Sequence, residues 1–152
     1  MLKLSKLTDY AVVLMAHLAR HPRDRFAAQE LAEATGLPHP TVSKLLKLLV
    51  KAGLLDSQRG AQGGYQLLRS AQSISASDLI LAIEGPVAMT ECSLDDAQCD
   101  LLGQCGVASN WQRVTLAVHQ LLASVSLAEL AQPQAIRLPW RKIPLQDISV
   151  SK

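Results

Sequence analysis

The chain has 152 residues, of which 49% are hydrophobic, 3% aromatic and 18% charged, with a net charge of +2. This length can bury a real core, and the apolar residues are mostly Leu, Ala and Val, which favours packed helices over a sandwich of sheets. Residues 1–70 hold ten Lys and Arg against five Asp and Glu, whereas residues 71–152 hold five against eight. The basic N-terminal half is typical of a domain that faces the phosphates of a nucleic acid. No apolar run has the length of a membrane span.

Three helices are predicted in the first third of the chain. Apolar residues recur at helical spacing from Thr8 or Asp9 to Arg20, over 28–35, and from Pro38 or Pro40 to Ala52. The short link that begins with Gly36 joins the second and third helices, which is typical of a helix-turn-helix.

The third helix has two different faces. Val42, Leu45, Leu49 and Ala52 form an apolar stripe, and the other side is polar and basic. A recognition helix needs this division, because one face packs on the domain and the other reads DNA. The candidate DNA-binding residues on this helix are His39, Pro40, Thr41, Ser43, Lys44 and Lys47.

Two short strands, 54–58 and 65–68, flank a glycine-rich hairpin tip. They predict a wing in which Arg59, at the base of the tip, enters a narrow minor groove. We therefore expect a mainly α fold with a small β-hairpin wing: a winged helix-turn-helix domain followed by a long C-terminal dimerisation helix.

A fourth helix is predicted over 76–84, capped by Ser75 and Asp78. A long helix from about 109 to 124 carries an apolar stripe of Trp111, Val114, Val118, Leu121 and Val125, which indicates packing against a second copy of the chain. The expected division is a DNA-binding domain at 1–85, a cysteine loop at 86–107, the dimerisation helix at 108–130 and a flexible tail at 131–152.

All three cysteines, Cys92, Cys99 and Cys105, fall between the fourth helix and the long helix, in the segment ECSLDDAQCDLLGQCG. Thiolates are preferred ligands of iron–sulfur clusters and zinc, so the grouping favours a metal or cluster site. A structural zinc site normally shows a closer cysteine pair, and a redox disulfide needs only two thiols. The odd number of cysteines argues against a secreted disulfide framework and indicates a cytoplasmic protein. No catalytic constellation is present, so we do not expect an enzyme.

Three segments, in order, resemble one family. They are residues 4–11 (LSKLTDYA), residues 59–65 (RGAQGGY) and the cysteine loop. Together they resemble the iron–sulfur-dependent winged-helix repressors that include IscR and NsrR, over roughly residues 1–130, and most of all the regulators of SUF cluster-assembly genes.

The resemblance implies a homodimer that binds a double-stranded DNA operator and affects RNA polymerase only indirectly. It implies an iron–sulfur cluster on Cys92, Cys99 and Cys105, either [2Fe–2S], which we favour, or [4Fe–4S]. Two positions depart from the family: six residues instead of five separate the first two cysteines, and Ala108 stands where IscR-type members have a histidine. Asp9 matches the aspartate that NsrR-type members contribute from the first helix of the partner subunit, so it is the candidate fourth ligand.

The sequence thus predicts a cytoplasmic transcription repressor that senses cluster status and controls iron–sulfur assembly genes. Two alternatives remain open. One is a cluster-free regulator of the same fold that senses oxidants by thiol chemistry. The other is a zinc-stabilised adaptor that binds protein instead of DNA.

Overall fold

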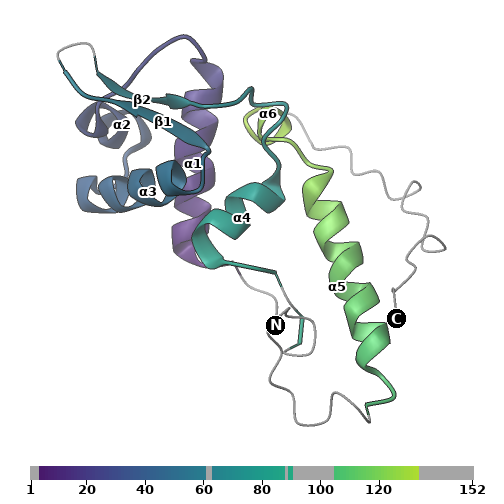
Figure 1. Ribbon diagram of the computed structural model, residues 1–152. Coiled ribbons are helices and arrows are strands. Elements are labelled where there is room, and N and C mark those ends of the chain that lie inside the picture. The colour runs from purple at the N-terminus through teal and green to yellow at the C-terminus, as the bar shows by residue number, and fades with distance from the viewer. Residues whose placement is uncertain (1–3, 61–62, 88, 91–104, 134–152) are drawn as a thin grey trace.

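The computed structural model describes residues 4–60, 63–87, 89–90 and 105–133. Within these ranges the chain is mainly helical, with one small hairpin, as predicted (Figure 1). The elements in chain order are α1 (Lys6–Arg20), α2 (Ala28–Thr35), α3 (His39–Lys51), β1 (Leu55–Gln58), β2 (Gly64–Leu67), α4 (Ala76–Glu84), α5 (Ala108–Ala123) and α6 (Leu127–Leu130).

Helix α1 begins two residues earlier than the sequence analysis expected. Ser5 is the N-cap: its hydroxyl accepts a hydrogen bond from the backbone N–H of Thr8, at 3.3 Å. A capping serine satisfies one of the N–H groups that the first turn leaves unpaired, so the helix starts directly after it. The other end, at Arg20, agrees with the prediction.

Helices α2 and α3 form the predicted helix-turn-helix. Gly36 ends α2 in the left-handed conformation, with φ of 69°, which costs glycine little. Helix α3 then begins at His39 and has Pro40 in its first turn, where the missing N–H of proline removes no helical hydrogen bond. It ends at Lys51, one residue before the predicted end.

The wing is the two-stranded antiparallel sheet, in which Leu55 lies opposite Leu67 and Gln58 lies opposite Gly64. A third segment also joins it. Phe26, from the link between α1 and α2, donates a backbone hydrogen bond to the carbonyl of Tyr65 at 3.1 Å and accepts one from the N–H of Tyr65 at 2.9 Å. The sequence analysis did not anticipate this pairing.

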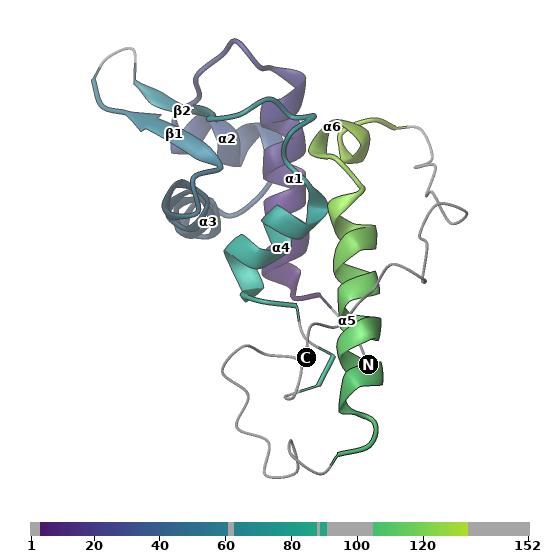
Figure 2. The same ribbon diagram turned by 45° about the vertical axis from the view of Figure 1, so that its right-hand side comes forward.

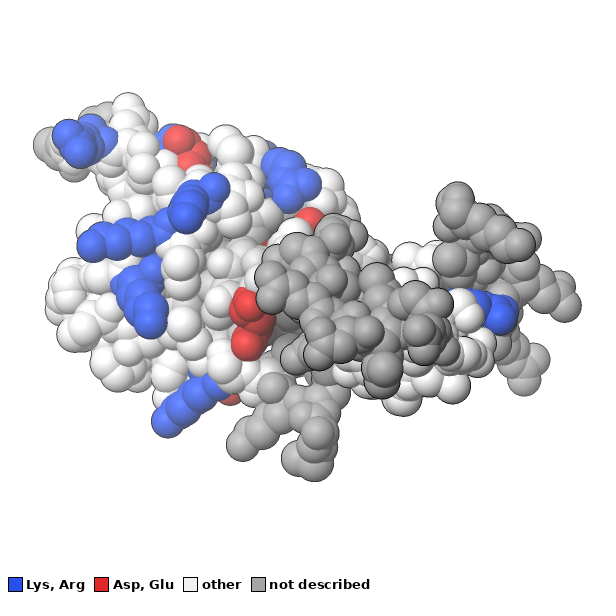
Figure 3. Space-filling view, turned by 60° about the horizontal axis from the view of Figure 1, so that its bottom comes forward, with Lys and Arg blue, Asp and Glu red and all other residues white. Residues whose placement is uncertain are grey.

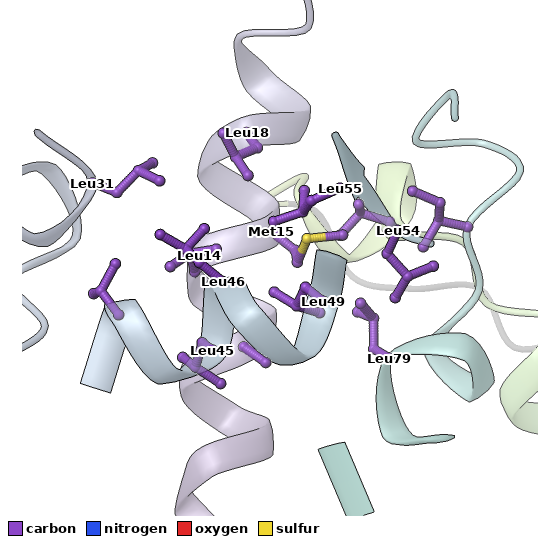
Figure 4. Close-up of a cluster of buried hydrophobic side chains, with 14 of the residues drawn as sticks. Leu14, Met15, Leu18, Leu31, Leu45, Leu46, Leu49, Leu54, Leu55 and Leu79 are labelled. Atoms are coloured by element: carbon purple, nitrogen blue, oxygen red, sulfur yellow. The ribbon is translucent and has the colours of Figure 1, made fainter. Parts of the chain in front are cut away.

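The core lies where α1, α3 and α4 meet the start of the wing (Figure 4). Leu14 and Met15 of α1 and Leu46 of α3 are fully buried within it. Aliphatic side chains of this kind contribute most of the stability of a small domain through the burial of apolar surface. The other fully buried large side chains are Leu18, Leu31, Leu45, Leu49, Leu54, Leu55, Ile74, Leu79 and Leu127.

The span expected to be one dimerisation helix, 108–130, divides into α5 and the short α6. Ser126 caps α6, and its hydroxyl and backbone N–H both donate to the carboxylate of Glu129. The chain then returns to the first domain: the N–H of Leu127 donates to the carbonyl of Ile74 at 2.7 Å. Figures 1 and 2 both show α6 beside α1, while α5 extends away from the winged domain.

Among the described residues, no helix is long and apolar enough to cross a membrane.

Candidate nucleic-acid interface

Helix α3 separates its apolar and polar residues as the sequence predicted, except that Ala52 is exposed, because the helix ends one residue before it, at Lys51. Val42, Leu45 and Leu49 are fully buried against the core. On the other side, His39, Pro40, Lys44 and Lys47 are exposed, and Thr41 and Ser43 are half-buried. The candidate recognition residues therefore lie together on the outer face of one helix, and the buried leucines fix the orientation of that face.

Arg59 follows directly after β1 and is exposed at the outer part of the wing. The neighbouring Gly60 has φ of 115°, a conformation that favours glycine, and its carbonyl accepts a hydrogen bond from Gly63 N–H at 2.9 Å. This turn holds the part of the tip that the structure describes. An arginine on such a projection has the reach that insertion into a minor groove requires.

Lys and Arg side chains gather over α3 and the wing, as Figure 3 shows on its left side. Lys44, Lys47 and Lys51 of α3 and Arg59 of the wing are all exposed. Positive charges spread over one face attract the phosphate backbone of a nucleic acid and release its counterions on binding. An α-helix that carries such charges on its outer face can enter the major groove of B-form DNA.

Two histidines and a phenylalanine connect α1 to the wing. The ring of Phe26 lies edge-on to the rings of His17 and His21, at centroid distances of 5.1 and 5.7 Å. Burial lowers the pKa of His17, and the nearby His21 and Arg20 lower it further. Only the fold reveals the contact that these two histidines share with Phe26.

Cys105 is the one predicted cysteine ligand within the described residues, and it is half-buried just before α5. Its carbonyl accepts a hydrogen bond from the N–H of Ala108, at 3.4 Å. Cys92 and Cys99 lie outside the described residues. Asp9 is exposed in the first turn of α1. Within the described ranges, no three His, Cys, Asp or Glu side chains come together at metal-binding distance, so this part of the chain leaves the proposed ligand set untested.

A helix-turn-helix with a basic outer face, followed by a glycine-rich wing, defines a winged-helix DNA-binding regulator. The family model of Rrf2, described as an iron-dependent transcriptional regulator, matches residues 4–133. The chain belongs to the Rrf2 family.

Known relatives agree with this assignment over most of their length. The regulator CymR of Bacillus subtilis is 32% identical over 133 residues, which are 86% of this chain and 90% of that protein. The solved structure of B. subtilis CymR, described as the global cysteine regulator, has a TM-score of 0.67 at 32% identity and covers 86% of this chain and 97% of its own.

The solved structure of IscR from T. potens has a TM-score of 0.63 at 32% identity, and it covers 85% of each chain. CymR and IscR relatives are named as HTH-type transcription regulators, which confirms the prediction of a DNA-binding regulator rather than an enzyme. They also confirm the predicted resemblance to regulators of the IscR type. Both IscR and CymR are therefore among the relatives of this chain.

Proposed function

We propose that this chain is a cytoplasmic, dimeric transcription repressor that senses iron–sulfur cluster status through Cys92, Cys99 and Cys105. Its targets on this proposal are genes of SUF-type cluster assembly. Repression needs only that the dimer occupies an operator, so RNA polymerase is affected indirectly. The observation that carries the proposal is that every cysteine of the chain falls in the single connection between α4 and α5.

The donor set fits an iron–sulfur cluster. Three thiolates with soft sulfur donors are the ligands that such clusters prefer, and the family description is iron-dependent. Cys105 is half-buried and lies three residues before the start of α5. When bound, a cluster would supply an oxidant-sensitive centre. Asp9 is exposed, and on this proposal the Asp9 of a second copy of the chain would be the fourth ligand beside the three thiolates.

The dimer is supported by the exposed apolar face of α5. Val107, Trp111 and Val114 are 55%, 41% and 44% exposed, and they follow one another at helical spacing along one face. Val118 and Leu121 continue the same face and are half-buried. A contiguous apolar stripe of this kind marks a surface that is covered in the assembled protein. A two-fold pair of these helices would also give two recognition helices, as a palindromic operator requires.

The chain's own geometry links the cysteine connection to the DNA-reading part. Both ends of the connection attach to helices that touch the winged domain, since α4 packs on α1 and α3, and α5 packs on α4. Fixing the three cysteines to one another would restrict how α5 lies against α4. Because α5 also carries the proposed dimer face, its orientation would set the spacing between the two recognition helices.

A thiol-based regulator without a cluster is the second candidate. It is supported by the likeness to CymR, which is described as a global cysteine regulator. In this reading the cysteines respond to oxidants by forming a disulfide. The family assignment favours both of these candidates over the protein-binding adaptor.

Anaerobic purification, followed by a visible absorption spectrum and iron and sulfide assays on one sample, tests the proposal. The expected result is a brown protein with matched iron and sulfide, whose ratio to protein separates [2Fe–2S] from [4Fe–4S]. Cys92→Ala, Cys99→Ala and Cys105→Ala should each abolish the colour, and Asp9→Ala should make it more labile without unfolding the chain. A protein that stays colourless after anaerobic reconstitution would support the thiol candidate.

A further inference from the structure

Arg25, in the link between α1 and α2, holds both strands of the wing. Its Nη2 donates to Oδ2 of Asp56 on β1 at 2.6 Å, and its Nη1 donates to the carbonyl of Gly64 on β2 at 3.3 Å. A planar guanidinium with several fixed donors can span two acceptors in this way, which the ammonium of lysine cannot do as rigidly. The residue therefore acts as a bracket across the hairpin.

The next residue strengthens the same attachment. Phe26 pairs with Tyr65 through two backbone hydrogen bonds, so the link is attached to β2 by one antiparallel bridge. This approach is possible only because residue 64 is glycine: its φ is 136°, and an added Cβ would lie 2.8 Å from the carbonyl oxygen of Phe26. Arg25, Phe26 and Gly64 together fix the wing to the helix-turn-helix.

We propose that Arg25 is a positioning residue for DNA binding, which sets the angle of the wing and so the place of Arg59, and does not itself hold the DNA. The inference rests on the proposed role of Arg59. The contacts favour it over direct phosphate binding, because the Arg25 side chain is only 22% exposed and its charge is already matched by Asp56. Arg59, in contrast, is exposed on the outer wing.

Direct binding has one observation in its favour. Arg25 and Arg59 both line an open hollow of ≈ 620 Å³ between the start of α2 and the wing, where a phosphate could enter. Glu30 also lines this hollow, and its carboxylate accepts a hydrogen bond from the N–H of Ala27 at 2.6 Å. An acid at the start of α2 repels a phosphate and already occupies a donor of that helix end, so the hollow suits a phosphate poorly.

The two roles of Arg25 predict opposite changes in DNA affinity for one substitution, Asp56→Asn. Asp56→Asn removes a negative charge near the DNA-binding face, so it should strengthen binding if Arg25 contacts a phosphate, because it frees that arginine. If Arg25 positions the wing, Asp56→Asn should weaken binding by about three- to tenfold, as Arg25→Gln should, since Arg25→Gln removes the guanidinium and Asp56→Asn replaces its charge-assisted bond with a weaker bond to a neutral amide oxygen. The probe is a duplex selected by the wild-type protein from a random-sequence pool, and affinity is measured by fluorescence anisotropy.

A double-mutant cycle with Arg59→Ala completes the test. Arg25→Gln should cost little additional affinity in the Arg59→Ala background, because the wing then no longer carries the arginine whose position Arg25 sets. A full additional loss there, or a gain in affinity for Asp56→Asn, would overturn the proposal. Arg69→Gln is the matched control: Arg69 also faces an acid, Asp78 on α4, at 3.9 Å, but it lies after β2 and outside the link that carries Arg25. It should leave the affinity unchanged.

Amide hydrogen exchange in the free protein separates failure of this inference from failure of the proposed function. Arg25→Gln and Asp56→Asn should each speed exchange at the N–H groups of Phe26 and Tyr65, while the core amides of α1 and α3 stay protected. Unchanged exchange at both positions would mean that Arg25 does not hold the wing, whether or not the protein binds DNA. If the wild-type protein selects no duplex, the proposed function fails while the exchange result still stands.

Discussion

The side chain of Thr8, in the first turn of α1, donates a hydrogen bond to the carboxylate of Glu84, the last residue of α4. The same carboxylate oxygen accepts the backbone N–H of Ser5 at 2.7 Å. Thr8 is fully buried, so the pair fixes the start of α1 to the end of α4. Asp9 follows Thr8, and the cysteine connection follows Glu84, so the two proposed sources of cluster ligands are joined by this contact.

These bonds make the contribution of Glu84 to stability depend on pH. The donors on Thr8 and Ser5 lower the pKa of Glu84 below its ordinary value of 4.5. A lowered carboxyl pKa stabilises the fold fully above the unfolded-state value, and this stabilisation is lost as the pH falls through the folded-state value. We expect Glu84→Gln to be less stable than the wild type near neutral pH and the difference to vanish in acid. Urea unfolding at a series of pH values measures this.

Thr8→Val should remove most of the pH-dependent stability that Glu84 provides, because it takes away the donor that lowers the pKa of Glu84 most. The double variant should then be little worse than either single one. A constant difference between Glu84→Gln and the wild type across the whole pH series would show that the carboxylate has no such role.

Gly64→Ala should destabilise the protein by about 1–3 kcal/mol, the usual cost of forcing a non-glycine residue into a disfavoured backbone region. The clash with Phe26 adds to this cost, since the backbone there cannot move without breaking the bridge to Tyr65. Gly106→Ala is the control, because a Cβ there would meet nothing within 4 Å. Equal unfolding midpoints for the two variants would contradict the tight packing of the link on β2.

Leu46→Ala should cost about 2–5 kcal/mol in the free energy of unfolding, the range for truncating a buried leucine. Leu46 is fully buried between α3 and the rest of the core. Leu68→Ala is the matched control, because Leu68 is 56% exposed and its truncation should change stability by less than about 0.5 kcal/mol. Chemical denaturation of both variants checks the assignment of the core.

Lys47→Ala should weaken DNA binding similarly for all sequences and should flatten the salt dependence of log K by about one unit, as loss of one phosphate contact requires. Lys47 is exposed on the outer face of α3. Lys6→Ala is the control, since Lys6 lies at the start of α1, where its ammonium is 5.4 Å from the ring of Tyr10. An unchanged salt slope for Lys47→Ala would remove this residue from the interface.

Val114→Glu should dissociate the proposed dimer by at least about tenfold in Kd, since it places an unpaired charge within an apolar contact. Val114 is 44% exposed in the single chain, so the substitution should leave the monomer folded. Sedimentation velocity over a range of concentrations measures the dissociation. If Val114→Glu sediments like the wild type, the dimer uses another surface or does not form.

Local signals in the sequence were enough to predict most of the helices. Gly36 and the Ser75–Asp78 cap act within a few residues, so their structural effect can be read from neighbouring positions. The polar face of α3 was also predictable, because helical periodicity alone determines which residues share a face. The start of α1 was wrong by two residues because Ser5 was not recognised as its cap.

Contacts between distant residues could not be predicted in the same way. Arg25 and Asp56 are 31 positions apart, and Ser5 and Glu84 are 79 apart, so nothing in their local sequence indicates that they meet. Helix α6 was missed for a related reason: it has only four residues and depends on pairing with the segment before α4. Short helices of this kind are stabilised by tertiary contacts and not by their own propensity.

The return of the chain at Leu127 has a consequence for how such a regulator evolves. Among the described residues, Leu127 is the one fully buried member of the core cluster that comes after Leu79, and it follows α5 in the sequence. The winged domain and the segment that follows α5 are therefore not interchangeable modules. A replacement that extends beyond α5 must bring a residue that fits the same place beside Ile74, or the older domain loses part of its own interior.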